Sequence, residues 1–514
     1  MSGGAGGPTN ADANGGAGGA NGDAPVRHTW SESDRFVPRT VVRPVQRLMD
    51  HEAAGGIAML VAAIAAIAWA NSPWSASYTD LWETHLVVEL GDVLHLDHLS
   101  LQAWINDALM TVFFLLVGLE IKRELVHGEL RDVRAVALPV MAALGGMAVP
   151  AAIYAAFNAG GAGSKGWGIP MATDIAFAVG VVTLLGRRVP LAAKIFLLTL
   201  AIADDVGAIV VIAIFYTGDL SWGWLATALV ALVVVAALRR GDVQALAPYL
   251  AVGGVMWLAL LESGVHATLA GVALGLLTPA WPLRSPRRFP ADARALIDRI
   301  ERATDDRVLT EEEYETNEQL MAEVARLSVY STSPLERLER ALSPWVAFVI
   351  VPLFALSNAG VELSGDALRG LVTDPVTLGV GLGLVVGKTV GIVGMAALAV
   401  KLGIGRLPAG TTWRTMTGLG ACAGIGFTVA LFITNLSFAD PELAGSAKVG
   451  ILAGSLVAGV IGYTVLRTAI PAAEPAPAEP SEAPDGAAPA DGSVQHGAGA
   501  TRVAPQHPAG TARP

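Results

Sequence analysis

Long apolar runs that are nearly free of charge dominate this sequence and leave few folds open to it. Most of them reach the roughly 20 residues that a helix needs to cross the hydrocarbon core of a membrane. Only 15% of all residues are charged, against about a quarter in soluble domains. The sequence therefore predicts an all-α polytopic membrane protein with twelve transmembrane helices. The runs fall near residues 54–72, 101–121, 136–158, 167–186, 190–216, 222–239, 246–261, 264–279, 344–360, 377–400, 411–437 and 444–467.

The charges between these runs predict the orientation. The first long loop, 72–100, carries five acids and no Lys or Arg, whereas the next, 122–134, carries four basic residues. Basic pairs or clusters recur in every second loop after that, at 187–188, 239–240 and 284–288. Because positively charged loops stay in the cytoplasm, we expect both termini on the cytoplasmic side.

Composition divides the chain into five regions. Residues 1–45 are rich in Gly, Ala and Asn and residues 469–514 in Pro, Ala and Glu, so we expect two disordered cytoplasmic tails. Transmembrane helices 1–8 occupy 46–283, and helices 9–12 occupy 341–468. The charged segment 284–340 is predicted to be a cytoplasmic insertion with one or two amphipathic helices, in ALIDRIERATDD and NEQLMAEVARL. It is either a regulatory element or a solvated decoration of a loop.

Ionisable residues inside the apolar runs are the strongest functional signal. Such residues cost several kcal/mol unless they face a cavity or a partner. Asp204 and Asp205 lie in the middle of one run, and because adjacent helical residues point about 100° apart, one can face a cavity while the other faces a helix. A carboxyl group in a partly dry site can hold a proton near neutral pH and exchange it for a hard cation such as Na⁺, which prefers oxygen ligands. The alternative for the two acids is a buried ion pair or a helix cap.

Lys388 is the natural counter-ion of these acids, and it is one of only six lysines in the chain. It is either a structural partner or a proton carrier. Spacing along the sequence does not decide whether it pairs with Asp204 or with Asp205.

Two apolar runs are interrupted by Gly and Pro. In GWGIPMATDIAFAVG the interruption precedes Thr173 and Asp174, and in GACAGIGFTVALF it consists of Gly424 and Gly426. A membrane tolerates such breaks only beside protein or water, and Asp174 would neutralise the positive N-terminal ends of the half-helices. Because spans three to five and ten to twelve each contain one central break, the pattern predicts two inverted three-helix repeats around a transport site.

Other classes of protein explain the buried acids and the interrupted helices less well. An aspartyl protease needs two carboxyl groups converging on one peptide bond, whereas adjacent acids diverge. A channel does not explain acids beside paired breaks, although a transporter exchanging K⁺ or Ca²⁺ for protons stays open. The polar segments carry no stripe of basic residues, so nucleic acid is not an expected ligand. The single cysteine, Cys422, is expected to be a packing residue rather than a ligand of a metal or redox cofactor. We therefore expect a secondary transporter without cofactor, not an enzyme.

The chain also resembles the bacterial NhaA-type Na⁺/H⁺ antiporters, over nearly all twelve spans. Only the tails and the insertion fall outside. This family is itself among the transporters in which paired broken helices are known to mark the transport site. The resemblance and the pattern of paired breaks are therefore not independent evidence. The matching strings are WINDALMTVFFLLVGLEIKREL (104–125), IPMATDIAFAVGVVTLLG (169–186), RVPLAAKIFLLTLAIADDVGAIVV (188–211), SGVHATLAGVALG (263–275), PWVAFVIVPLFALSNAGV (344–361), GKTVGI (387–392) and GIGFTVALFI (424–433).

The resemblance implies a fold in which broken helices four and eleven cross. It implies electrogenic exchange of cytoplasmic Na⁺ or Li⁺ for incoming protons across the plasma membrane, serving pH and sodium homeostasis. By matching motifs, Asp204 and Asp205 are the Na⁺-binding pair, with Asp205 preferred as direct ligand and Thr173 as an additional oxygen. Asp174 and Lys388 are the charge-compensating and proton-coupling residues. The family also implies a homodimer through an outer-face hairpin, which loop 73–100 would supply.

Four further residues match a cluster that the family links to pH response. Glu120, Arg123 and Glu124 correspond to its motif at the cytoplasmic funnel, and Glu339 to a glutamate of the same cluster. The string RLERALSPW around Glu339 lacks the histidines of the best-studied members, so histidine-based sensing is not expected there.

Overall fold

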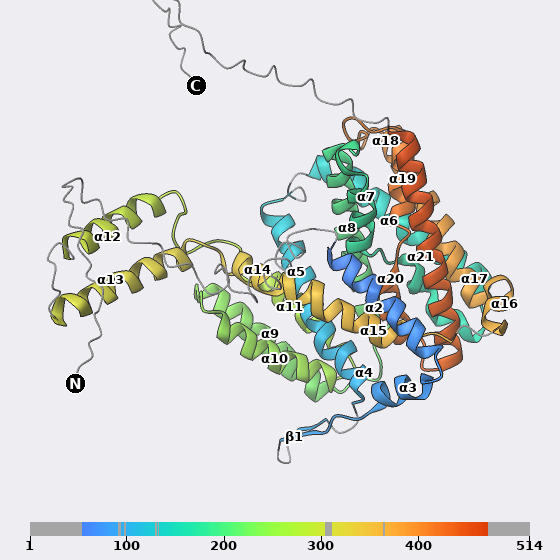
Figure 1. Ribbon diagram of the computed structural model, residues 1–514, viewed down its shortest axis with the longest axis horizontal. Coiled ribbons are helices and arrows are strands. Elements are labelled where there is room, and N and C mark those ends of the chain that lie inside the picture. The colour runs from blue at the N-terminus through green and yellow to red at the C-terminus, as the bar shows by residue number, and fades with distance from the viewer. Residues whose placement is uncertain are drawn as a thin grey trace, which may run out of the picture. The chain divides into compact units, whose positions relative to one another are not determined.

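The computed structural model describes residues 54–90, 94–96, 99–128, 131, 133–303, 311–362 and 365–470. The tail predicted at 1–45 and most of the tail predicted at 469–514 lie outside these ranges. The described residues are almost entirely helical (Figure 1). The exception is a hairpin in the first long loop, in which β1 (Val88–Leu90) pairs antiparallel with β2 (Leu94–Leu96).

Seven helices in the described part are long and apolar enough to cross a membrane. Three of them contain a π-helical turn, a feature that is frequent at functional sites. Their bounds are Leu101–Val126 (α4 Leu101–Trp104, η3 Ile105–Leu109, α5 Met110–Val126), Ala135–Asn158 within α6 (Val133–Asn158), Leu191–Phe215 (α8), Trp222–Arg240 (α9), Pro334–Asn358 (α14 Pro334–Trp345, η7 Val346–Ile350, α15 Val351–Asn358), Pro375–Lys401 (α17 Pro375–Leu382, η8 Gly383–Gly387, α18 Lys388–Lys401) and Pro441–Ala469 (α21).

Three further apolar segments are pairs of helices with a sharp bend. The pair η5 (Ala162–Met171) and α7 (Ile175–Leu184) bends by 44°, and the pair α19 (Trp413–Cys422) and α20 (Phe427–Ser437) bends by 49°. Both segments that Gly and Pro predicted to be broken are therefore broken. The third pair, α2 (Ala54–Ala70) and α3 (Ser75–Glu83), bends by 114°. Two shorter apolar helices, α10 (Leu246–Leu261) and α11 (Thr268–Leu277), complete the apolar set.

The charged segment folds as two helices that pack on each other, α12 (Phe289–Ala303) and α13 (Glu311–Tyr330) (Figure 1). This agrees with the amphipathic helices expected there. The charged segment was predicted to extend to residue 340, but the next helix, α14, already begins at Pro334. The cause is local: the Ser333 side chain accepts a hydrogen bond from the Glu336 backbone N–H, and Pro334 occupies the first turn, where proline is favoured. Short elements outside the long helices are η6 (Gly186–Arg188) and α16 (Gly365–Thr373).

A close approach of α6 and α18 positions Lys388, the first residue of α18. A Cβ atom added at Gly145 of α6 would lie 2.2 Å from the carbonyl oxygen of Gly391, so only glycine allows the two backbones to come this near. The lysine side chain consequently enters the bundle interior, where it is fully buried.

Candidate ion-binding site

The two broken helices meet at their breaks. The backbone N–H of Asp174, at the start of α7, donates to the carbonyl oxygen of Ile425 at 2.6 Å. The Thr173 hydroxyl reaches the carbonyl oxygen of Ala423, at the end of α19, at 2.8 Å. A Cβ at Gly424 would lie 2.4 Å from the Leu384 carbonyl oxygen, so this glycine is required for the close packing of the break.

Asp174 lies at the N-terminal ends of two half-helices. Its carboxylate caps α7 by accepting from the Phe177 backbone N–H at 3.2 Å. It also accepts from the backbone N–H of Thr428 at 3.1 Å and from the Thr428 hydroxyl at 2.5 Å, in the first turn of α20. One buried negative charge thereby compensates two positive helix ends.

Asp204, on α8, is held by two partners. Its Oδ2 accepts from the Thr173 hydroxyl at 2.6 Å and forms an ion pair with the Lys388 ammonium. Both charged side chains are 0% exposed. Within the described part of the chain, the other oxygen, Oδ1, is buried without a hydrogen-bond partner. The structure therefore assigns Lys388 to Asp204, a choice that the sequence left open.

Asp205 differs from its neighbour. It is 7% exposed, and no hydrogen bond or ion pair joins its carboxylate to another residue that the structure describes. The site thus contains one carboxylate that is already neutralised and one that is not. Around them lie the oxygens that a hard cation takes as ligands: two carboxylates and the Thr173 hydroxyl.

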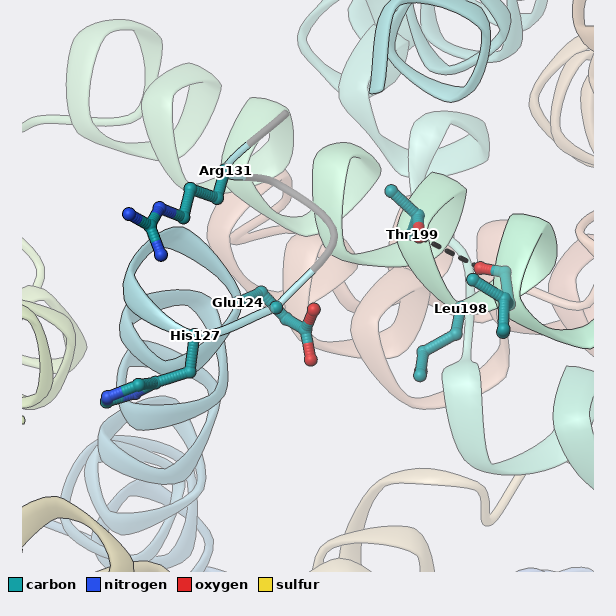
Figure 2. A pocket seen from close by; sticks show the side chains of 7 residues that line it. Glu124, His127, Arg131, Leu198 and Thr199 are labelled. Atoms are coloured by element: carbon teal, nitrogen blue, oxygen red, sulfur yellow. Dashed lines mark hydrogen bonds between the residues drawn. The ribbon is translucent and has the colours of Figure 1, made fainter. Parts of the chain in front are cut away.

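A cleft of about 720 Å³ opens at one end of α8 (Figure 2). Glu124, His127 and Arg131 line one side, and Ile195, Leu198 and Thr199 of α8 line the other. Thr199 precedes Asp204 by five residues, or about 7.5 Å along the helix axis. The cleft therefore lies close to the buried acids.

The predicted pH-response residues gather beside this cleft. Arg123 of α5 forms an ion pair with Glu339 of α14, and its Nε lies 3.7 Å from Oε1 of Glu124. Glu120 is half-buried, one turn of α5 before Glu124. Side-chain exposures of 38% for Arg123 and 16% for Glu339 show a partly solvated pair, unlike the pair at Lys388.

Sequence reasoning did not identify the partners that hold the buried acids in place. Thr428 is the partner of Asp174 and the carbonyl of Ala423 is a partner of Thr173, across about 250 residues in each case. The only local signal was the Gly-rich break before Thr428.

The long apolar helices define an integral membrane protein, and its buried charges are concentrated where two broken helices meet. The chain belongs to the Na⁺/H⁺ antiporter 1 family, whose model matches residues 46–466. It is 46% identical over 450 residues to Na⁺/H⁺ antiporter NhaA 2 of Sorangium cellulosum, covering 87% of this chain and 94% of that protein. It is 48% identical over 425 residues to NhaA 2 of Pseudomonas syringae (82% of this chain, 94% of that protein). NhaA of Rhodopirellula baltica is 44% identical over 430 residues (84% and 95%).

Proposed function

We propose that this protein is a secondary Na⁺/H⁺ antiporter of the bacterial plasma membrane. It extrudes cytoplasmic Na⁺ or Li⁺ in exchange for protons and serves pH and sodium homeostasis. The observation that carries this proposal is the carboxylate of Asp205, which has no partner among the described residues, beside the paired carboxylate of Asp204 at the meeting point of two broken helices. The names of the relatives, all Na⁺/H⁺ antiporters, support the choice of ions.

The chemistry is a competition for the same oxygens. Asp205 holds either a proton or Na⁺, and the ion draws further on Oδ1 of Asp204 and on the Thr173 hydroxyl oxygen. When Na⁺ binds, the proton must leave Asp205. Lys388 then either keeps Asp204 as its partner or gives up its own proton, because an unpaired ammonium buried among apolar groups is costly. The exchange is electrogenic when Lys388 also gives up its proton, because two protons then move against one Na⁺.

We infer twelve spans, with both termini in the cytoplasm. They are the seven long helices, α2, the two broken pairs at the site, α10 and α11. Spans three to five and ten to twelve form two inverted repeats, each with a broken helix at its centre. The tails at 1–45 and 469–514 and the helices α12 and α13 of the insertion at 284–340 are cytoplasmic. The β1–β2 hairpin lies on the outer face and joins two copies in a homodimer.

Ions reach the site from the cytoplasm through the cleft beside Glu124 and Thr199. The charges at its mouth, Glu120, Arg123, Glu124 and Glu339, set the local potential and hence the pH response of the exchange. This role rests on their position next to the cleft.

The test is ΔpH reported by a quenched dye in everted membrane vesicles. Added Na⁺ or Li⁺ relieves the quench with the unmodified protein, and Asp205→Asn abolishes the relief. Asp219→Asn is the matched control, because it removes an exposed acid from the loop between α8 and α9; we expect unchanged activity at equal protein levels. Relief by K⁺ alone, or an active Asp205→Asn variant, contradicts the proposal.

A second measurement addresses the competition itself. Isothermal titration of the purified protein with Na⁺, repeated in buffers of different ionisation enthalpy, reports the protons released. We expect proton release on ion binding. Binding without proton release refutes the mechanism even if transport is observed.

A further inference from the structure

A cluster of amide side chains, one buried and three partly buried, lies away from the ion site. It consists of Gln102, Asn106, Asn358 and Asn435 and is called the amide cluster below. Asn358, at the end of α15, is its centre and is 0% exposed. Its Oδ1 accepts from Gln102 Nε2 at 3.0 Å and from Asn435 Nδ2 at 2.8 Å, and its Nδ2 donates to Asn106 Oδ1 at 2.9 Å.

The amide cluster ties one broken helix to its surroundings. Gln102 and Asn106 belong to the α4–η3 segment, while Asn435 belongs to α20. Asn435 follows Thr428 by seven residues, which is two helical turns along the same face. Helix α20 is thus anchored to Asp174 at its start and to Asn358 near its end.

An aromatic layer separates the amide cluster from the acids. Phe432 of α20 packs against Phe114 of α5 with ring centroids 5.2 Å apart, and both rings are buried. On α20 this layer lies between Thr428 and Asn435. At the other end of the site, the cleft at Glu124 and Thr199 is open. The site is thus bordered by an open cleft at one end and by a pair of packed aromatic rings at the other.

We propose that the Asn435–Asn358 hydrogen bond of the amide cluster is the latch of the outer gate: it holds α20 against α15 while the site faces the cytoplasm, and it breaks when the site opens outward. This inference rests on the proposed antiport, because a carrier with one central site must close one side before it opens the other. Neutral amides suit a bond that has to break in each cycle, since water replaces their hydrogen bonds at little cost. Asn435 is accordingly a positioning residue, which acts through α20 and does not touch the ion.

The expected change in the apparent KM follows from the strength of one hydrogen bond. A buried side-chain bond changes an equilibrium by a factor of about 2 to 10. If the latched state dominates, loss of the bond multiplies the small outward-open population by nearly that factor. In Asn435→Ala, the apparent KM for Na⁺ at the outer face should therefore fall about 2- to 10-fold. The KM at the cytoplasmic face should hardly change, because most of the protein still faces the cytoplasm.

The experiment compares initial exchange rates in right-side-out and everted vesicles, which expose the outer and cytoplasmic faces, respectively. Two controls separate the latch from structural damage. Gln102→Ala removes two hydrogen bonds between α4 and α15, to the Ser357 carbonyl and to Asn358 Oδ1, and leaves the bond to α20 in place. Asn158→Ala removes a buried amide that links α6 to the Pro375 carbonyl. Neither control should lower the KM at the outer face alone.

The outcomes are distinct. A fall of the KM at the outer face with little change at the cytoplasmic face, in Asn435→Ala alone, supports the latch. Unchanged values, equal shifts at both faces, or the same result in Gln102→Ala overturn it, while Na⁺-dependent exchange by the unmodified protein leaves the proposed function intact. Absence of such exchange in the unmodified protein refutes the proposed function itself.

Discussion

The ion pair between Lys388 and Asp204 should stabilise the protein only as a pair, and a double-mutant cycle measures this. The three variants are Lys388→Met, which keeps the length of the side chain without its charge, Asp204→Asn, and the two combined. Both side chains are 0% exposed, so neither charge that is left behind can be solvated by water. Each single substitution therefore leaves an uncompensated buried group.

The expected magnitude follows from burial. Removing one partner of a buried ion pair costs about 3–5 kcal/mol, whereas replacing both partners is often close to neutral. The double variant should accordingly be more stable than either single variant, with a coupling energy of about 3 kcal/mol or more. The pair between Arg123 and Glu339 is the internal control. Because Arg123 is 38% exposed, the same cycle there should give a coupling below about 1 kcal/mol.

The assay is equilibrium unfolding of the purified protein in mixed micelles with increasing SDS, followed by circular dichroism. Na⁺ is omitted, because a ligand of the folded state would add its own stabilisation. Single variants that unfold within about 1 kcal/mol of the unmodified protein would show that the pair contributes little. Additive losses in the double variant would likewise refute the argument from burial.

Four other outcomes follow from the site. Thr173→Val removes a hydroxyl from the buried carboxylate and should raise the KM for Na⁺ about 10-fold, while Thr173→Ser should restore it. Asp174→Ala removes the cap of α7 and the bonds to the start of α20, and should lower the free energy of unfolding by about 2 kcal/mol in the same SDS assay. Glu339→Gln removes one negative charge beside the cleft, so protons leave the neighbouring acids more readily and the pH profile of exchange should shift toward lower pH. Replacing 290–330 by a short linker should leave exchange and its pH profile unchanged, because the backbone hydrogen bond from Leu335 to Pro279 lies outside the replaced segment and still joins its two flanks. A shifted profile would make the segment regulatory.

The sequence predicted those features that depend on neighbouring residues. Apolar runs and their interruptions by Gly and Pro are local signals, and the structure has helices in the runs and bends at both interruptions. The start of α14 was missed, although the signal was present in Ser333 and Pro334, because the charged residues that follow resemble the insertion. Once the boundary is known, this cap explains it.

Partners across long separations could not be predicted. Lys388 and Asp204 are 184 residues apart, and only the packing of α18 on α6 decides which acid the lysine reaches. The amide cluster was missed for a different reason. An asparagine near a helix end, such as Asn358, is usual as a cap, and only the structure shows that its amide joins three helical segments.

The two adjacent acids are not equivalent in their surroundings, and under the proposed mechanism this difference determines which of them exchanges ions. Their side chains point about 100° apart on α8, so the lysine that enters from α18 pairs with Asp204 and leaves Asp205 without a partner among the residues that the structure describes. A carboxylate that is already neutralised gains little from Na⁺, whereas an unpaired carboxylate in a dry site must hold either a proton or a cation. In the proposed mechanism, binding of one species therefore excludes the other at Asp205. Had both acids faced the lysine, a single positive charge would have been shared between them, and neither would have required the transported ion.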